Sequence, residues 1–83
     1  MKRIEVHCYS GHKGEERPLS FVLNERRVQV VEVLERRLEE DRHSKERRRL
    51  FKVKADDGMV YTLVYREVQD QWFLMGNSED ARG

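Results

Sequence analysis

The sequence predicts a small, mostly β domain: an antiparallel meander of five to six strands that forms an SH3-like or partly open barrel. Apolar residues alternate with polar residues along much of the chain, as in strands with one buried face. Turn-forming pairs such as Asp57-Gly58, both tolerant of positive φ, separate the apolar runs. The runs lack the helical spacers of parallel βαβ units, so antiparallel pairing is expected.

The first two strands are expected on either side of a surface loop. The first covers residues 2–9, and residues 10–17 form the loop because they contain glycines and many charges. Pro18 fits the loop exit, since it has no N–H to donate to a sheet. Asn24 and Glu25 predict a tight turn after the second strand. The alternating apolar residues are Ile4, Val6 and Cys8 in the first strand, and Leu19, Phe21 and Leu23 in the second.

Residues 26–41 fit two structures. As a helix, their apolar residues form a stripe with spacing i, i+1, i+4 and i+8. As a strand, their valines face inward if a bulge at Val31 shifts the register. Four valines between positions 28 and 33 favour a strand in the first half. Residues 34–41 contain better helix formers, and the residue pattern leaves this half open between strand and helix.

The clearest structural signal is a hairpin in the second half of the chain. Residues 48–55 and 59–66 are rich in aromatic and β-branched residues, and both faces of the second run are apolar, which indicates a central strand. A loop over 41–47, a turn over 67–70 and a last strand led by Trp72 and Leu74 complete the pattern. We therefore expect one β domain over residues 1–75 and a flexible tail over 76–83.

Composition points to a charged surface around a thin core. The chain has 83 residues, of which 40% are charged, and a net charge of +1. Cys8 is the single cysteine, which fits a reducing compartment. The sequence has neither a signal-peptide core nor an apolar run long enough to span a membrane. We expect a cytoplasmic monomer without a membrane segment.

No motif indicates catalysis, a metal or a cofactor. His7 and Cys8 are neighbours, but successive residues of a strand point to opposite faces and cannot readily share a zinc ion. Paired carboxylates such as Asp56-Asp57 fall in predicted turns, where solvated charge is the simplest interpretation. General acid–base catalysis needs a pocket that so small a core can hardly enclose. The expected protein is therefore not an enzyme.

Basic residues offer one candidate binding surface. If the lysines of the 48–55 strand share a face with neighbouring arginines, they form a stripe that could follow a phosphate backbone. The candidate residues are Arg47, Arg48, Arg49, Lys52 and Lys54. Glutamates interrupt each basic cluster, which favours a solvated, ion-paired surface instead.

Several positions match a pattern of Tyr-Ser-Gly, Glu-Arg-Pro, Asp-Gly and a closing Trp. They are Tyr9, Ser10, Gly11, Glu16, Arg17, Pro18, Phe21, Phe51, Asp57, Gly58, Tyr61, Leu63 and Trp72. Over residues 5–75 the chain thus resembles a family of short bacterial proteins, and its Phe-to-Trp half is similar to a C-terminal domain of inactive Y-family DNA polymerase relatives. The resemblance implies strand over 26–40 and brings no activity with it. The chain departs from the family at Leu38, where relatives have an aromatic residue.

These observations predict an interaction module. The first hypothesis is a protein-binding adaptor that uses an exposed strand edge or the loop from Ser10 to Arg17. The alternative is a single-stranded nucleic-acid-binding domain linked to DNA repair, which would use the basic residues above.

Overall fold

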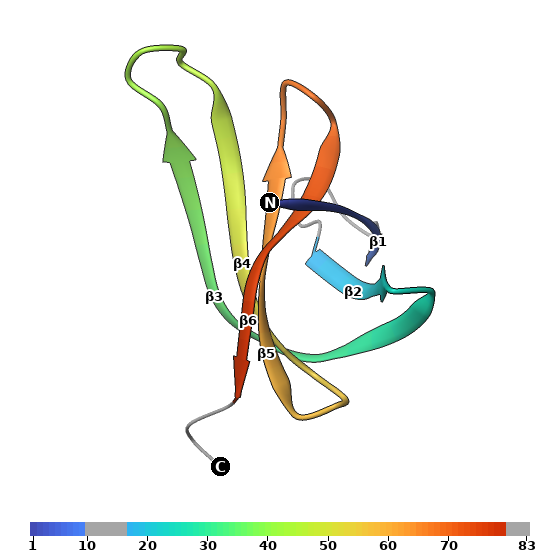
Figure 1. The fold of residues 1–83 in the computed structure, drawn as a ribbon. Coiled ribbons are helices and arrows are strands. Elements are labelled where there is room, and N and C mark those ends of the chain that lie inside the picture. Colours follow the sequence, from blue (N-terminus) through green and yellow to red (C-terminus); the bar gives the residue numbers. More distant parts are fainter. Residues whose placement is uncertain (10–16, 80–83) are drawn as a thin grey trace.

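The computed structural model describes residues 1–9 and 17–79. They form six strands: β1 (Lys2–Tyr9), β2 (Arg17–Leu23), β3 (Arg26–Glu40), β4 (Arg47–Ala55), β5 (Met59–Arg66) and β6 (Gln71–Glu79). Each strand pairs antiparallel with the next, and β6 pairs back with β1, so the sheet closes into a barrel (Figure 1). The prediction of a small, mostly β antiparallel barrel is confirmed.

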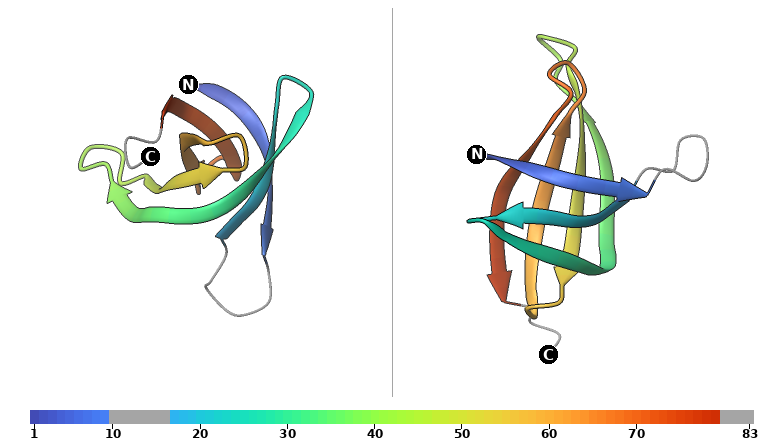
Figure 2. Two further views of the ribbon diagram at one scale, coloured as in Figure 1. Left: turned by 90° about the horizontal axis from the view of Figure 1, so that it is seen from below. Right: turned by 90° about the vertical axis from the view of Figure 1, so that its right-hand side faces the viewer.

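β3 is the longest strand and takes part in both halves of the barrel. Its first residues pair with β2, and from Val30 onward it pairs with β4, so the strand bends between its two partners (Figure 2). The strand interpretation of residues 26–40 is confirmed, and the helix alternative for 34–41 is wrong. Arg36 to Glu40 remain in register with Phe51 to Arg47, and this pairing outweighs their helix propensity.

The barrel interior is filled by aliphatic and aromatic side chains. Phe21 and Leu63 are fully buried, and the Phe21 and Tyr61 rings meet edge to face with centroids 4.9 Å apart. Trp72 lies at one side of this core, against Phe51 at 5.5 Å between ring centroids. The filled interior leaves the outer surface for contacts with other molecules. The buried cluster is Ile4, Phe21, Val28, Phe51, Val53, Ala55, Tyr61 and Leu63.

Two tight connections use positive φ angles. Asn24 and Glu25 have φ values of 51° and 65°, which confirms the predicted turn between β2 and β3. Between β4 and β5, Gly58 has a φ of 84°, whereas Asp57 keeps a negative φ. The Gly58 amide donates to the Ala55 carbonyl at 3.1 Å. This connection is therefore a three-residue loop in which glycine alone occupies the left-handed region.

The last strand continues beyond its predicted end. β6 runs to Glu79, and residues 76–79 pair with residues 59–62 of β5, so this part of the expected tail belongs to the sheet. Residues 80–83 lie outside the described part of the chain. Within the described ranges, no helix has the length and hydropathy needed to cross a membrane.

Candidate functional site

Four register shifts interrupt the regular pairing of the strands. At each shift one strand contributes an extra residue that has no direct partner, which defines a β-bulge. The extra residues are Leu19, Val31, Leu34 and Met75. The bulge predicted at Val31 is thus confirmed, because Val30 lies opposite Ala55 and Glu32 opposite Lys54. The prediction that Val31 also faces inward is wrong, since its side chain is 64% exposed.

The bulge in β2 explains why Leu19 is outside the core. Ser20 lies opposite His7 and Pro18 opposite Cys8, so Leu19 is skipped by the pairing. The prediction that Leu19 shares an inward face with Phe21 and Leu23 is therefore wrong. Leu19 is 43% exposed, whereas Phe21 is fully buried.

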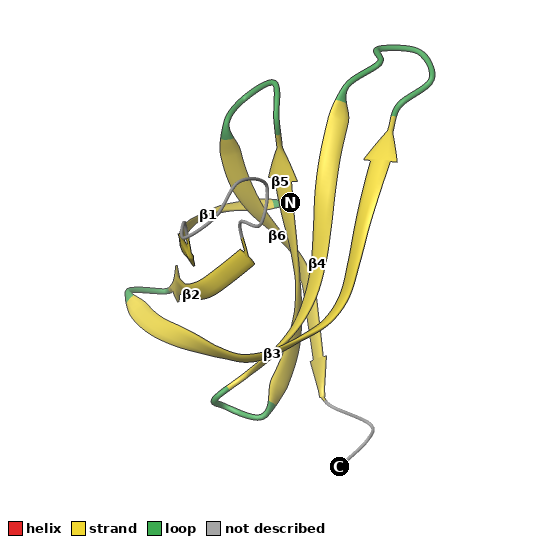
Figure 3. Ribbon diagram, turned by 180° about the vertical axis from the view of Figure 1, so that it is seen from behind, coloured by secondary structure: helices red, strands yellow, loops and turns green. Residues whose placement is uncertain are grey.

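Leu19 and Val31 line one groove between β2 and β3. Figure 3 shows how the backbones of these two strands separate beyond their shared turn. The groove has a volume of about 470 Å³, and Val31 is 64% exposed. Two exposed aliphatic side chains therefore lie together in one concave surface, where a single partner could cover both. We call this the β2–β3 groove, and its lining residues are Arg17, Pro18, Leu19, Val30, Val31, Glu32, Val33 and Arg36.

One edge of β3 borders this groove. Pairing between β2 and β3 ends at Ser20 and Gln29, and from Val30 to Glu40 the described residues pair with β3 only on its β4 side. Along this stretch, no described strand pairs with the backbone N–H and C=O groups on the other edge. Such an edge can accept an additional strand from another molecule.

The groove has an excess of positive charge. Arg17 lies over the Tyr9 ring, with its guanidinium carbon 5.6 Å from the ring centroid. Arg36 is exposed and forms no ion pair with a residue in the described ranges. Among the described residues of the lining, Glu32 is the single acidic one, and it lies opposite Lys54 of β4, a cross-strand position at which opposite charges attract.

The five basic residues predicted to contact nucleic acid are divided between two faces of β4. Phe51 and Val53 point into the barrel. Because side chains alternate along a strand, residues an odd number of positions away from them lie on the outer face of β4. Arg47 and Arg49 lie on the same face of β4 as Phe51 and Val53, beyond the end of the core. Arg48, Lys52 and Lys54 lie on the outer face. The structure therefore does not bring all five together.

Glutamates accompany most of these basic residues. Arg48 Nη2 lies 3.1 Å from Glu39 Oε1, and Arg49 Nη2 lies 3.4 Å from Glu67 Oε1. The lysines of β4 lie opposite glutamates of β3 in the register, Lys52 with Glu35 and Lys54 with Glu32. The outward stripe consequently alternates in charge across the two strands.

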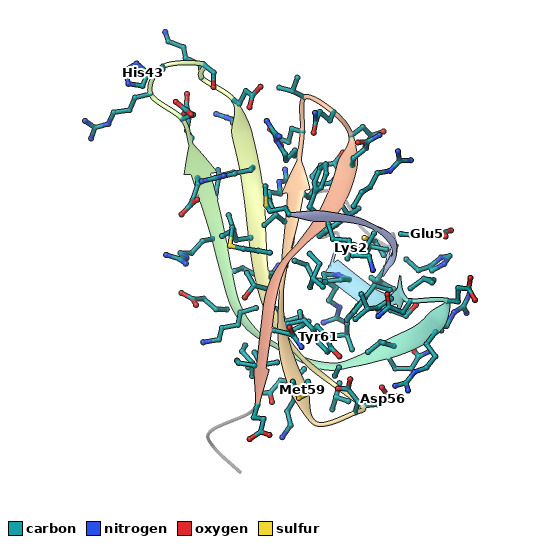
Figure 4. The ribbon with its side chains drawn as sticks, in the orientation of Figure 1. Lys2, Glu5, His43, Asp56, Met59 and Tyr61 are labelled. Atoms are coloured by element: carbon teal, nitrogen blue, oxygen red, sulfur yellow. The ribbon has the colours of Figure 1, made fainter. Side chains whose placement is uncertain are left out.

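A smaller basic cluster lies at the end of the β3–β4 hairpin. Arg42, Lys45 and Arg47 are exposed and form no ion pairs within the described ranges. Asp41 orders the loop, since its carboxylate accepts the His43 amide hydrogen at 2.8 Å and its carbonyl accepts that of Lys45 at 2.7 Å. Figure 4 shows His43 at this end of the molecule.

The other sequence candidates have structural partners. His7 is exposed and Cys8 is half-buried, with the opposite orientations expected for neighbours on a strand. Asp56 and Asp57 form hydrogen bonds that stabilise the β4–β5 connection. Asp56 exchanges hydrogen bonds with the Gln29 backbone, and its side chain accepts the Gln29 amide at 3.3 Å. Across residues 1–9 and 17–79, no group of three or more potential metal ligands converges.

Asp57 also binds Tyr61, a buried tyrosine whose pKa is raised. The Tyr61 hydroxyl donates to Asp57 Oδ2 at 2.5 Å, and Figure 4 places Tyr61 above the turn that contains Asp56. Burial, with the nearby Asp57 carboxylate, raises the pKa of Tyr61 to about 12. The second Asp57 oxygen accepts the Met59 amide at 2.9 Å. These contacts stabilise the fold and leave the hydroxyl protonated, which suits a structural role.

A second concave surface lies between the ends of β1 and β6. It has a volume of about 620 Å³ and is lined by polar residues together with Ile4, Val6, Val22 and Trp72. Trp72 packs against Phe51 and Tyr65, and the Lys2 ammonium donates to Asn24 at 2.7 Å. These groups already have partners within the fold, so the β2–β3 groove is the stronger candidate.

Comparisons with protein-family models, curated proteins and solved structures find no significant match to this chain. Its function must therefore be inferred from the geometry of its own residues. Sequence reasoning anticipated an exposed strand edge and the bulge at Val31. It did not anticipate that Leu19 and Arg36 meet Val31 in one groove, because the alternating pattern places Leu19 inside.

Proposed function

We propose that the protein is a non-enzymatic binding module that captures an extended segment of a partner protein in the β2–β3 groove. The observation that supports it is the convergence of two bulge residues, Leu19 and Val31, beside the β3 edge. Burying both side chains against a partner would remove apolar surface from water. The adjacent backbone groups would hydrogen-bond to an extended chain.

The bulges favour specific binding over non-specific aggregation. A long, flat, apolar edge invites aggregation, and bulges are one of the devices by which proteins limit it. Here two bulges, at Val31 and Leu34, interrupt the edge, and charged residues occupy most of Glu35 to Glu40. Beyond the groove, Leu38 is the one aliphatic residue on this part of the edge, so Leu19 and Val31 together form the apolar surface that a partner can cover.

A displayed library of random peptides tests this proposal. Peptides enriched on the wild-type protein should be lost when Val31 is replaced by glutamate, because the substitution puts a charge on the apolar surface of the groove. Val68→Glu is the matched control, since Val68 is 69% exposed in the β5–β6 turn. Nuclease treatment should not alter capture. The proposal fails if no peptide is enriched over bare support, or if Val31→Glu retains the same peptides as Val68→Glu.

The alternative proposal is single-stranded nucleic-acid binding, and the hairpin end favours it. Arg42, Lys45 and Arg47 are exposed there without ion pairs in the described ranges. If these residues contact phosphates, oligonucleotide affinity should fall steeply with salt and drop when all three are replaced by alanine. Absence of binding at about 50 mM salt would exclude this alternative. The Val31→Glu variant should bind oligonucleotides as the wild type does.

A further inference from the structure

We infer that the segment bound in the β2–β3 groove is acidic and aliphatic, and that it adds to β3 as an extra strand. This inference rests on the proposed function and specifies the chemistry of the partner. It follows from three features of the groove: its apolar surface, its two arginines and the β3 edge beside it.

The apolar surface selects aliphatic side chains. Leu19 and Val31 lie at the groove with Val30, Val33 and Pro18 beside them, and none of the described residues that line it is aromatic. Successive residues of an added strand point to opposite faces, so every second side chain of the partner would meet this surface. A segment with small branched residues at alternate positions fits that spacing and has high strand propensity.

The two arginines select carboxylates. Arg36 extends from β3 and Arg17 from β2, so basic groups lie on both strands that form the groove. Arg17 makes a cation–π contact with Tyr9, its guanidinium carbon 5.6 Å from the ring centroid, and a guanidinium in such a contact can still donate its N–H groups to a carboxylate. Charge-assisted and bidentate hydrogen bonds of this kind are stronger than neutral ones.

The β3 edge determines the conformation of the partner. Beyond Gln29, β2 no longer pairs with β3, so an extended chain could continue the sheet where β2 leaves it (Figures 1 and 3). Regular pairing between β3 and β4 resumes from Glu35 to Glu40, where the strand is straight enough to accept a partner. The aliphatic residues of the segment would then lie near Val31 and its carboxylates near Arg36.

Two labelled peptides test the charge preference by fluorescence anisotropy. Both are blocked at their ends and alternate valine with a charged residue, glutamate in one and lysine in the other. We expect the wild-type protein to bind the glutamate peptide at least about tenfold more tightly, a preference that declines with added salt. The double variant Arg17→Glu, Arg36→Glu should reverse the preference. Arg3→Glu, Arg27→Glu is the control of equal net charge, and it should keep the wild-type order.

A third peptide tests strand addition. N-methylation at alternate backbone nitrogens of the glutamate peptide removes donors to β3 without changing the side chains, and it should abolish binding. Unchanged binding of the methylated peptide would refute strand addition. Equal affinity for the glutamate and lysine peptides, lost in Val31→Glu, would refute the acidic preference and leave the proposed function standing. Loss of Val31-dependent capture in the library experiment would instead refute the proposed function itself.

Discussion

Leu19 and Val31 belong to different strands, yet each is the extra residue of a bulge and both line the same groove. Leu19 is exposed although it lies two residues from buried Phe21, because the bulge interrupts the alternation of β2. Val31 lies three residues from buried Val28, so alternation alone directs it outward. The bulge in β2 therefore adds Leu19 to Val31 and enlarges the exposed apolar surface. The cost of exposing it is easier to explain if a partner covers it.

Because Leu19 and Val31 are exposed, we expect these two groove residues to contribute little to folding. Val31→Glu should change the free energy of unfolding by less than about 1 kcal/mol, since the side chain makes few buried contacts. Urea denaturation followed by circular dichroism measures this change. A loss of several kcal/mol would show that Val31 supports the fold, and the binding experiments would then need Leu19→Glu instead.

Leucine-to-alanine substitutions should separate the core from the surface. Leu63 is fully buried between β4 and β6, whereas Leu38 on the β3–β4 hairpin is 61% exposed. Leu63→Ala should lower the free energy of unfolding by about 2–5 kcal/mol, because it leaves a cavity, and Leu38→Ala by no more than about 0.5 kcal/mol. Urea midpoints at constant m-value provide the comparison. Similar losses in the two variants would contradict the described core.

Removing a glycine from one tight turn and introducing a glycine into the other should have opposite effects on stability. Gly58 has a φ of 84° and open space where a Cβ would lie, so Gly58→Ala should cost about 1 kcal/mol through backbone strain alone. Glu25 has a φ of 65°, so Glu25→Gly should relieve similar strain, offset in part by the greater freedom of the unfolded chain. We expect a net gain of roughly 0.5 kcal/mol. Thermal unfolding should thus shift in opposite directions for the two variants.

Because the pKa of Tyr61 is raised, we expect the free energy of unfolding to fall at high pH. Its pKa is raised to about 12 in the folded protein, so between about pH 10 and about pH 12 the folded state keeps a proton that the unfolded chain releases. The stabilisation is complete below pH 10 and is lost as the pH rises through this range, by an amount on the order of 2 kcal/mol. Unfolding free energies at about pH 9 and about pH 11.5 measure the loss.

Tyr61→Phe removes the titrating group and should flatten this part of the pH dependence. It should also cost about 1 kcal/mol at neutral pH, because the hydrogen bond to Asp57 is lost. Tyr9→Phe is the control, since Tyr9 is an exposed tyrosine outside the core. If Tyr61→Phe follows the same alkaline profile as the wild type, another group is responsible for it.

Local patterns in the sequence were sufficient for most of the strand map. Alternation placed β1 at residues 2–9, and Asn24-Glu25 and Gly58 marked connections that the structure contains. The bulge at Val31 could be anticipated, because Val28, Val30 and Val33 cannot share one face of a strand without an extra residue between them. These features depend on neighbouring residues, which is the information that a sequence pattern contains.

The remaining features depended on residues distant in the chain. β4 determined that residues 34–40 form a strand, since their own propensities favoured a helix and pairing with Arg47 to Lys52 outweighed them. β1 determined that Leu19 is exposed. Ser20 pairs with His7 and Pro18 pairs with Cys8, so Leu19 has no partner in β1. The sequence thus specifies where strands form, through the two-residue period of side chains. The closed barrel sets their registers, and with them the groove, because hydrogen bonds between strands fix which residue of each pair is skipped.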